Sequence, residues 1–477
     1  MKKSISKLFL YKHRFIIGYI ILGLAFVALL LAMPLFANNG LSEAEIDSST
    51  SAYYLNIKSV TNGDLVNLPY RALQKLSISI FGLTAYSVKL PSIIVGLLLG
   101  FLLILLLNRW FKNNVSLLAS CLIVLSTPFL YLAGTGTPLI MIVFWPTLLL
   151  WLGSKIHGEK RPKPLYSIAF ALALLLAIFT PYMIYFAVFC VLFVFLQPHL
   201  RFIVKNLPKI PLIITCILIV SGITALIINT ISHPQTIMEL LFAKNFDLGN
   251  FGHNLITGAA PIVSWRGSAN SAILAPLIGL PTFAIALIGI FSTTKGFFAS
   301  RNSIATLLLI FTVIITGFNS EAIIFFILPF TILIAHGIKY ILEKWYGLFP
   351  SNPYARISAI LPLTVLFALI LIPSTLQYLY GYHYNPNITE TFNNNLSIIR
   401  DNLKDEILVT ESHQDFYQIL DRSTKITVTN EISEDFEHFA YLGKPESVPA
   451  KFQLTRIITS SKSDNSDIIY LYTAKGE

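Results

Sequence analysis

The chain has 477 residues, of which 55% are hydrophobic and only 12% are charged, and its mean hydropathy is +0.70. A soluble protein of this size carries about 25% charged residues, so the composition excludes an ordinary soluble enzyme. The net charge of +10 is of the kind seen in nucleic-acid-binding proteins. The positions of the basic residues indicate membrane topology instead, and we expect no nucleic-acid partner.

Long apolar segments dominate the sequence from beginning to end. Most approach the roughly 20 residues needed to cross a bilayer core of about 30 Å. Lipid offers the backbone no hydrogen-bond partner, so each segment must be helical. We therefore predict an α-helical polytopic membrane protein with about eleven transmembrane helices. They cover residues 15–36, 90–107, 115–132, 139–152, 165–179, 183–196, 210–228, 272–291, 303–317, 322–338 and 359–378.

Basic residues alternate between the two sides of these spans. With the N-terminus in the cytoplasm, the cytoplasmic segments hold 19 of the 34 Lys and Arg residues, the outer loops 6 and the C-terminal tail 9. The positive-inside rule then predicts a multi-pass protein of the plasma (inner) membrane with a cytoplasmic N-terminus and an extracytoplasmic C-terminus. The first apolar run lacks a clear cleavage site, so we expect a retained anchor.

The sequence divides into two predicted domains. Residues 1–380 form the transmembrane domain, with large outer loops at 37–89 and 229–271. Residues 381–477 hold 15 of the 24 acidic residues and have the length of one small soluble α/β domain. Within it, 407–410, 425–429 and 468–472 are typical of strands, and 415–420 of a helix.

Three acidic residues follow the first span closely. Glu43, Glu45 and Asp47 would share one side of an extended backbone, whereas on a helix Glu43 and Asp47 would share a face and Glu45 would point away. Such a group suits a general base or a divalent-cation site, with Mg or Mn as the candidate cofactor. Alternatively, the acids only stabilise the start of a loop helix.

Residues 68–81 form the clearest amphipathic pattern outside the spans. Leu68, Ala72, Leu76 and Ile80 recur every four residues, which predicts a helix lying in the membrane interface. Arg71 and Lys75 lie on a neighbouring face. They suit the phosphate of a lipid-linked substrate, or they only extend toward bulk lipid headgroups.

Two other outer segments carry candidate binding groups. In the second large loop, Trp265 could stack on a sugar ring, and Arg266 could bind phosphate with His253 nearby. The alternative is an interfacial Trp anchor beside an Arg that reaches the headgroups. The turn at 134–138 contains two glycines, so either a ligand approaches its N–H groups or it only connects two spans.

The first third of the chain resembles a known family. An acidic loop leads to Gly63-Asp64, to Pro69, to a helix ending in Ile80-Phe81-Gly82, and then to Ala85-Tyr86-Ser87-Val88-Lys89-Leu90-Pro91-Ser92. This order is similar to that of the GT-C membrane glycosyltransferases, in the branch of the protein O-mannosyltransferases and aminoarabinose transferases. The resemblance covers about residues 37–155.

The resemblance implies transfer of a sugar from a polyprenyl-phosphate carrier to an acceptor on the outer face, with inversion. The family's acid in the first loop is a catalytic base or a metal ligand, and it matches Glu45, with Glu43 and Asp47 as competitors. The family's Lys-Pro-Pro-Leu falls on Asn67-Leu68-Pro69-Tyr70. The lysine is absent, so Arg71 or Lys75 would have to meet the carrier phosphate.

Two other classes of protein stay open. A relative that kept the fold but lost the chemistry would bind the lipid carrier or act as a membrane scaffold. The missing lysine and the uncharged turn at 134–138 favour this alternative. A transporter would need charges inside its spans, and these spans are nearly free of charge.

Overall fold

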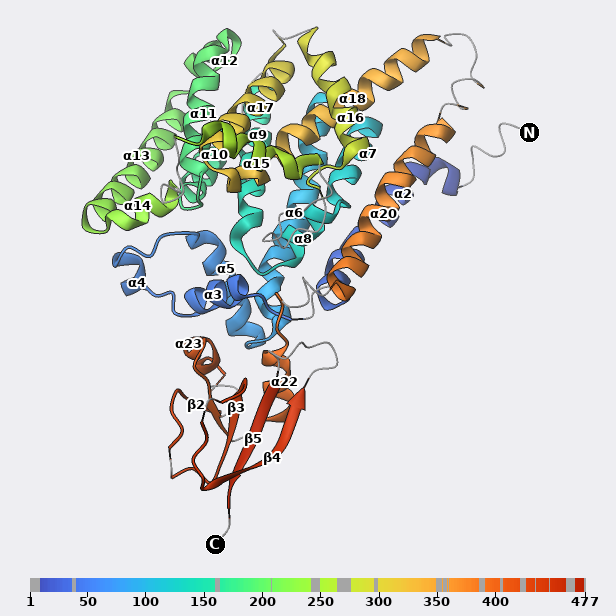
Figure 1. The fold of residues 1–477 in the computed structure, drawn as a ribbon. Helices are drawn as coiled ribbons and strands as arrows, with labels where there is room; N and C mark the ends of the chain where they lie inside the picture. Colours follow the sequence, from blue (N-terminus) through green and yellow to red (C-terminus); the bar gives the residue numbers. More distant parts are fainter. Residues whose placement is uncertain are drawn as a thin grey trace.

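The computed structural model describes residues 9–36, 40–158, 164–206, 208–241, 249–263, 276–295, 299–348, 354, 358, 360–385, 391–403, 406–420, 426–433, 435–445, 447–459 and 468–475. Figure 1 shows three parts along one direction: a large group of helices, a layer of short helices beneath it, and a small sheet beyond that layer.

The large group contains the apolar helices. Within the described residues, six helical segments are long and apolar enough to cross a membrane, or up to eight if two bent pairs each form one span. The six involve α6 (Ala85–Trp110), η1 (Pro138–Ile140) with α9 (Met141–Gly158), α13 (Lys209–Ser232), α17 (Ser300–Phe318), η3 (Ser320–Phe326) with α18 (Ile327–Leu348), and α20 (Ile360–Tyr384).

The two bent pairs are α7 (Asn113–Val124) with α8 (Thr127–Gly134), at 66°, and α11 (Met183–Leu196) with α12 (Pro198–Lys205), at 97°. Each second helix has a proline in its first turn, and a proline disfavours helical backbone at the residue before it. Shorter apolar helices lie in α2 (Phe9–Phe36), α10 (Pro164–Ala177) and α16 (Leu280–Thr294). Every predicted span thus overlaps an apolar helix, but eleven complete spans are not confirmed.

The layer of short helices holds the first outer segment. It consists of α3 (Glu43–Tyr53), α4 (Ile57–Thr61) and α5 (Leu68–Phe81), and it separates the apolar helices from the sheet (Figure 1). The second outer segment contributes α14 (Pro234–Leu240) and α15 (Phe251–Val263).

The C-terminal part forms a five-stranded sheet with the order β2-β1-β3-β5-β4. Its elements are α22 (Asn395–Asn402), β1 (Ile407–Val409), α23 (Gln414–Gln418), β2 (Thr427–Thr429), β3 (His438–Leu442), β4 (Phe452–Thr459) and β5 (Ile468–Ala474). β1 pairs in parallel with β2 and β3, whereas β5 pairs antiparallel with β3 and β4. The three strands and the helix predicted for the tail are present, and β3 and β4 were not predicted.

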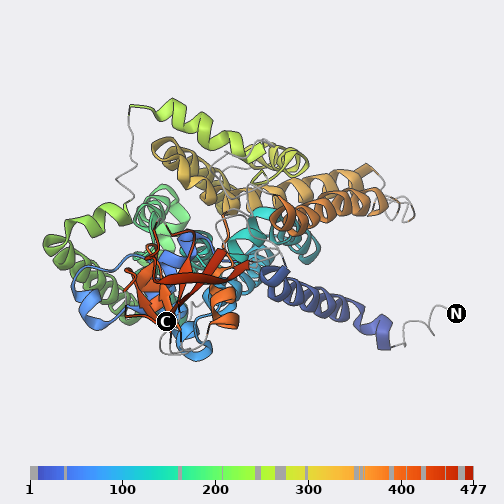
Figure 2. The ribbon, with the colours of Figure 1, turned by 60° about the horizontal axis from the view of Figure 1, so that its bottom comes forward.

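The C-terminal part packs onto the short helices, with α23 against α3. Ile46 of α3 and Ile78 of α5 share one buried apolar cluster with Leu408 and Phe416 of the C-terminal part. Figure 2 turns the lower side of Figure 1 toward the viewer, so that the C-terminal part lies in front. The two predicted domains therefore share a core, and their boundary stays a prediction.

Candidate functional site

α3 begins with a capping box. Ser42 precedes the helix, and its N–H and hydroxyl donate to Glu45 Oε2 at 2.8 and 3.1 Å. This arrangement fixes where the helix starts. At 3.6 residues per turn, Glu43 and Asp47 fall on one face and Glu45 on another, and Glu43 and Asp47 are exposed while Glu45 is fully buried. Of the two predicted arrangements of these acids, the helical one, in which Glu45 points away from Glu43 and Asp47, is therefore correct.

The other oxygen of Glu45 reaches a distant part of the chain. Oε1 accepts the backbone N–H of Gly136 at 2.5 Å. Gly136 lies in the turn between α8 and η1, where an added Cβ would be 2.8 Å from the Val88 carbonyl oxygen, so the close approach needs glycine. The N–H that could have met a sugar or phosphate is bound by the protein's own carboxylate.

Gln74 of α5 connects the elements around Glu45. Its amide nitrogen donates to the carbonyls of Val88, at 3.1 Å, and Gly136, at 3.0 Å, and its oxygen accepts from Ser48 at 2.8 Å. The side chain is fully buried. One amide therefore joins α3, α5, the start of α6 and the turn at 134–137, and a buried amide needs such partners.

Several ionisable side chains lie within electrostatic range of Glu45. Burial raises the pKa of the Tyr70 phenol above its usual value, a hydrogen bond with Ser92 opposes this, and the charge of Glu45 raises it further. Lys89, at 1% exposure, donates from Nζ to the Gly40 carbonyl at 2.7 Å. The charge of Glu45 acts on three further groups: Lys89, Tyr131 and Tyr378.

The tyrosines near Glu45 contact one another as an aromatic group. Tyr131 stacks on Tyr382 with ring centroids 5.3 Å apart, and Tyr378 lies 5.0 Å from Tyr382. The Tyr378 hydroxyl is buried and has no hydrogen-bond partner in the part of the chain that the structure describes. A carboxylate near phenols and an ammonium can exchange a proton with a hydroxyl brought beside it.

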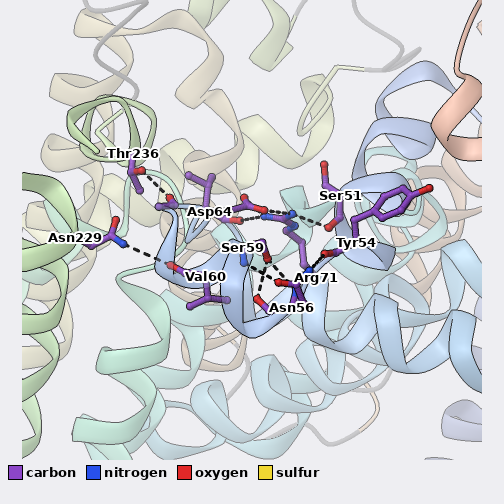
Figure 3. A network of polar contacts seen from close by, with 11 residues as sticks. Ser51, Tyr54, Asn56, Ser59, Val60, Asp64, Arg71, Asn229 and Thr236 are labelled. Carbon is purple, nitrogen blue, oxygen red and sulfur yellow. Dashed lines mark hydrogen bonds and ion pairs between the residues drawn. The ribbon is translucent and has the colours of Figure 1, made fainter. Parts of the chain in front are cut away.

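The two predicted phosphate ligands turn inward. Arg71 is 7% exposed, and its guanidinium makes a two-pronged ion pair with Asp64, in which Nη2 lies 2.7 Å from Oδ2. Nη2 also donates to the Ser51 carbonyl at 2.6 Å (Figure 3). Lys75 donates to the Leu55 carbonyl. Leu73, Leu76 and Ile80 of α5 are exposed instead, as expected for a helix in the interface.

The segment 55–67, which we call the strap, carries α4 and Asp64. Asn229 of α13 donates to Val60 at 3.5 Å, and Thr236 of α14 donates to Gly63 at 2.7 Å (Figure 3). At its end, the Asn67 N–H donates to the Phe179 carbonyl at 2.7 Å. The strap therefore joins α5 to the turn between α10 and α11 and to the second outer segment.

An apolar groove runs between α11 and α17. Its volume is about 450 Å³, and its walls are mostly Leu, Ile and Phe side chains. The polar lining residues belong to one end: Tyr182 and Tyr185 lie at the start of α11, and Asn319 follows the end of α17. Tyr182 lies three residues after Phe179, so this end adjoins the point where the strap meets the α10–α11 turn.

The remaining candidate residues belong to the second outer segment. His253 is exposed on α15, and Trp265 and Arg266 lie outside the described residues. Across the described ranges, no group of three or more His, Cys, Asp or Glu side chains could hold a metal ion. Glu43, Glu45 and Asp47 in particular do not converge, so this acidic group does not fit a divalent cation.

Five residues around Glu45 were not predicted as site residues: Tyr70, Gln74, Lys89, Tyr131 and Tyr378. Lys89 had a signal, since a charge at the edge of an apolar span is a candidate for function. Tyr131 and Tyr378 had none, because aromatic residues are frequent throughout the spans. Only the fold brings α5, α6, α8 and α20 together around Glu45.

Comparison with known proteins supports the predicted resemblance. The dolichyl-phosphate-mannose-protein mannosyltransferase family matches residues 69–225, about a third of the chain. No curated protein matches by sequence. The likeness extends further in structure than in sequence.

Two solved proteins have a similar fold. ArnT from Cupriavidus metallidurans in the apo state is 11% identical with a TM-score of 0.55, over 95% of this chain and 98% of ArnT. The same protein bound to undecaprenyl phosphate gives a TM-score of 0.52 at 10% identity. The Archaeoglobus fulgidus oligosaccharyltransferase, tethered to an acceptor peptide, gives 0.51 at 10% identity, over 85% of this chain and 63% of that enzyme.

Proposed function

We propose that this chain, which has the fold of the GT-C membrane glycosyltransferases, transfers a sugar from a polyprenyl-phosphate carrier to an acceptor on the outer face of the membrane. The observation that carries the proposal is the apolar groove, whose polar end adjoins the strap and α5. A groove of this kind suits one long apolar chain with a polar head.

The groove supports a polyprenyl carrier in particular. Its lining is almost entirely apolar, so an isoprenoid chain can pass from the bilayer into it without exposing apolar surface to water. A head group at the polar end of the groove would lie beside the start of α5. The matched family is named for a dolichyl-phosphate sugar, and one solved neighbour holds undecaprenyl phosphate.

In the proposed reaction, the acceptor hydroxyl attacks the anomeric carbon from the face opposite the phosphate. The new C–O bond forms as the bond to the phosphate oxygen breaks, and the polyprenyl phosphate leaves with the electron pair. Glu45 takes the proton of the hydroxyl. Because the Glu45 carboxylate is buried against Gly136, this step requires α3 to move away from the turn at 134–137.

Transfer from a radiolabelled polyprenyl-phosphate sugar in proteoliposomes tests the role of Glu45. We expect Glu45→Gln to abolish transfer, because the amide cannot take the proton. Gln is compatible with a capping box, so α3 should still form. Glu43→Gln, on the exposed face of the same helix, is the matched comparison. Unchanged transfer by Glu45→Gln would remove Glu45 from this role.

One observation favours a second candidate, a carrier-binding relative without catalysis. Both key charges are occupied: Glu45 accepts three hydrogen bonds, and Arg71 is paired with Asp64. Such a protein would bind the carrier phosphate in the same groove and turn nothing over. The same proteoliposomes distinguish the two candidates, since the second predicts carrier binding with no transfer by the unaltered chain.

A further inference from the structure

We propose that Arg71 is a phosphate-binding site which Asp64 occupies as an internal ligand, and that the phosphate of the lipid carrier replaces Asp64. The inference rests on the proposed carrier binding but not on sugar transfer. It assigns the carrier phosphate to Arg71, one of the two cations of α5, and gives the strap a role in binding.

The geometry of the pair is that of an occupied anion site. The Arg71 guanidinium uses two nitrogens on the two carboxylate oxygens of Asp64, and arginine binds phosphate in the same two-pronged way. Its Nε is buried and has no hydrogen-bond partner in the described part of the chain. Asp64 thus leaves the guanidinium incompletely satisfied, and a phosphate with more acceptor oxygens could satisfy it better.

The two partners differ in how easily they can separate. The Asp64 side chain is 42% exposed, whereas that of Arg71 is 8% exposed. Asp64 lies on the strap directly after Gly63, whose φ of +96° is a turn conformation, while Arg71 lies inside α5. Asp64 is therefore the partner that moves. Arg71 would be left as a buried, unpaired cation unless another anion arrived, which is strongly unfavourable.

The site lies where a lipid head group is expected. The strap meets the α10–α11 turn through Asn67 and Phe179, next to the polar end of the groove. Lys75 lies one turn after Arg71 on α5 and is bound to a strap carbonyl, that of Leu55. Release of the strap would therefore free Lys75 and remove Asp64 from Arg71, which keeps its bond to the Ser51 carbonyl of α3. The anion and the strap thus compete for the same two residues.

Binding of farnesyl phosphate to the full chain in nanodiscs tests this competition. Removal of an internal competitor raises the apparent affinity by the reciprocal of the fraction of time that the site was free. We expect Asp64→Asn to bind about tenfold more tightly and Arg71→Gln to lose binding. Glu343→Gln, which removes another carboxylate from an ion pair, with Lys339, should bind as the unaltered chain does.

Each other outcome overturns the proposal. If Asp64→Asn weakens binding as Arg71→Gln does, Asp64 positions the arginine and does not compete with phosphate. Unchanged affinity in Asp64→Asn would also show that Asp64 does not compete with phosphate. If inorganic phosphate binds as tightly as farnesyl phosphate, or if phosphatidylglycerol nanodiscs block binding where phosphatidylcholine nanodiscs do not, the site does not select the carrier.

A second measurement covers the case in which Asp64→Asn does not fold. Saturating farnesyl phosphate should increase amide hydrogen exchange in the strap of the unaltered chain, and no increase would refute displacement. The assay also separates this inference from the proposed reaction. If the chain shows the displacement but no transfer, this inference stands and the proposed reaction is wrong. If it shows transfer but no displacement, the reaction stands and this inference is wrong.

Discussion

At the scale of single residues, the site is organised by backbone groups as much as by side chains. Glu45 binds the N–H of Gly136, and Gln74 binds the carbonyl of the same residue. Lys89 binds the Gly40 carbonyl. A buried peptide group that loses its partner costs stability, so each of these side chains holds a turn in place.

Gln74 gives the clearest stability prediction. Gln74→Leu removes the partners of two buried carbonyls and one hydroxyl, so we expect a loss of about 2–3 kcal/mol, seen as a lower midpoint of thermal unfolding in detergent. Gln453→Leu, at an exposed position of β4, should change stability by less than about 0.5 kcal/mol. Equal shifts in the two variants would show that Gln74 has no special role.

At the scale of elements, close helix packing depends on glycine. Gly289 of α16 and Gly337 of α18 face the backbone of the opposite helix. An added Cβ would lie 2.0 Å from the Leu333 carbonyl oxygen at the first position and 2.1 Å from that of Ile285 at the second. Small residues at such contacts let two membrane helices approach closely. These two helices pack without room for a methyl group.

Gly337→Ala should therefore separate α16 from α18 and lower stability by about 3 kcal/mol. Gly347→Ala is the matched control, because Gly347 is in the same helix and has nothing within 4 Å of an added Cβ. Alanine is the better helix former, so the control should be neutral or slightly stabilising. The measurement is again thermal unfolding in detergent, and a neutral Gly337→Ala would contradict the packing account.

The sequence predicted the elements better than their contacts. Residues 68–81 were predicted as a helix and are α5, because an amphipathic period is a local property. β4 was missed, since most of its residues are exposed and the pattern does not alternate. The burial of Glu45 could not be predicted either, because its partner Gly136 is 91 positions away and spacing carries no information about such a contact.

At the scale of the whole molecule, orientation is the main open prediction. The charge distribution predicts a cytoplasmic N-terminus and an outer C-terminal sheet. The first outer segment and the sheet share a buried cluster, so both must lie on the same side. One labelled position in each compartment is then sufficient to fix the topology.

Cysteine labelling in intact cells tests this orientation. After the native cysteines are changed to serine, Asn402→Cys in α22 should react with a membrane-impermeant maleimide. Asn114→Cys, in the first turn of α7, should react only after permeabilisation. Both positions are exposed in the structure, so accessibility within the fold is matched. Labelling in the reverse order would invert the topology and move Glu45 to the cytoplasmic side.

The junction beside α3 also sets an order in time. The backbone of Leu41 pairs with Asn393, and the Tyr54 hydroxyl donates to the Asp415 carbonyl, 361 positions later. Translation proceeds at about 5–20 residues per second, so the ribosome needs on the order of tens of seconds between these two points. During that interval α3 lacks its C-terminal partners, and the junction beside Glu45 is completed only after Asp415 has been synthesised.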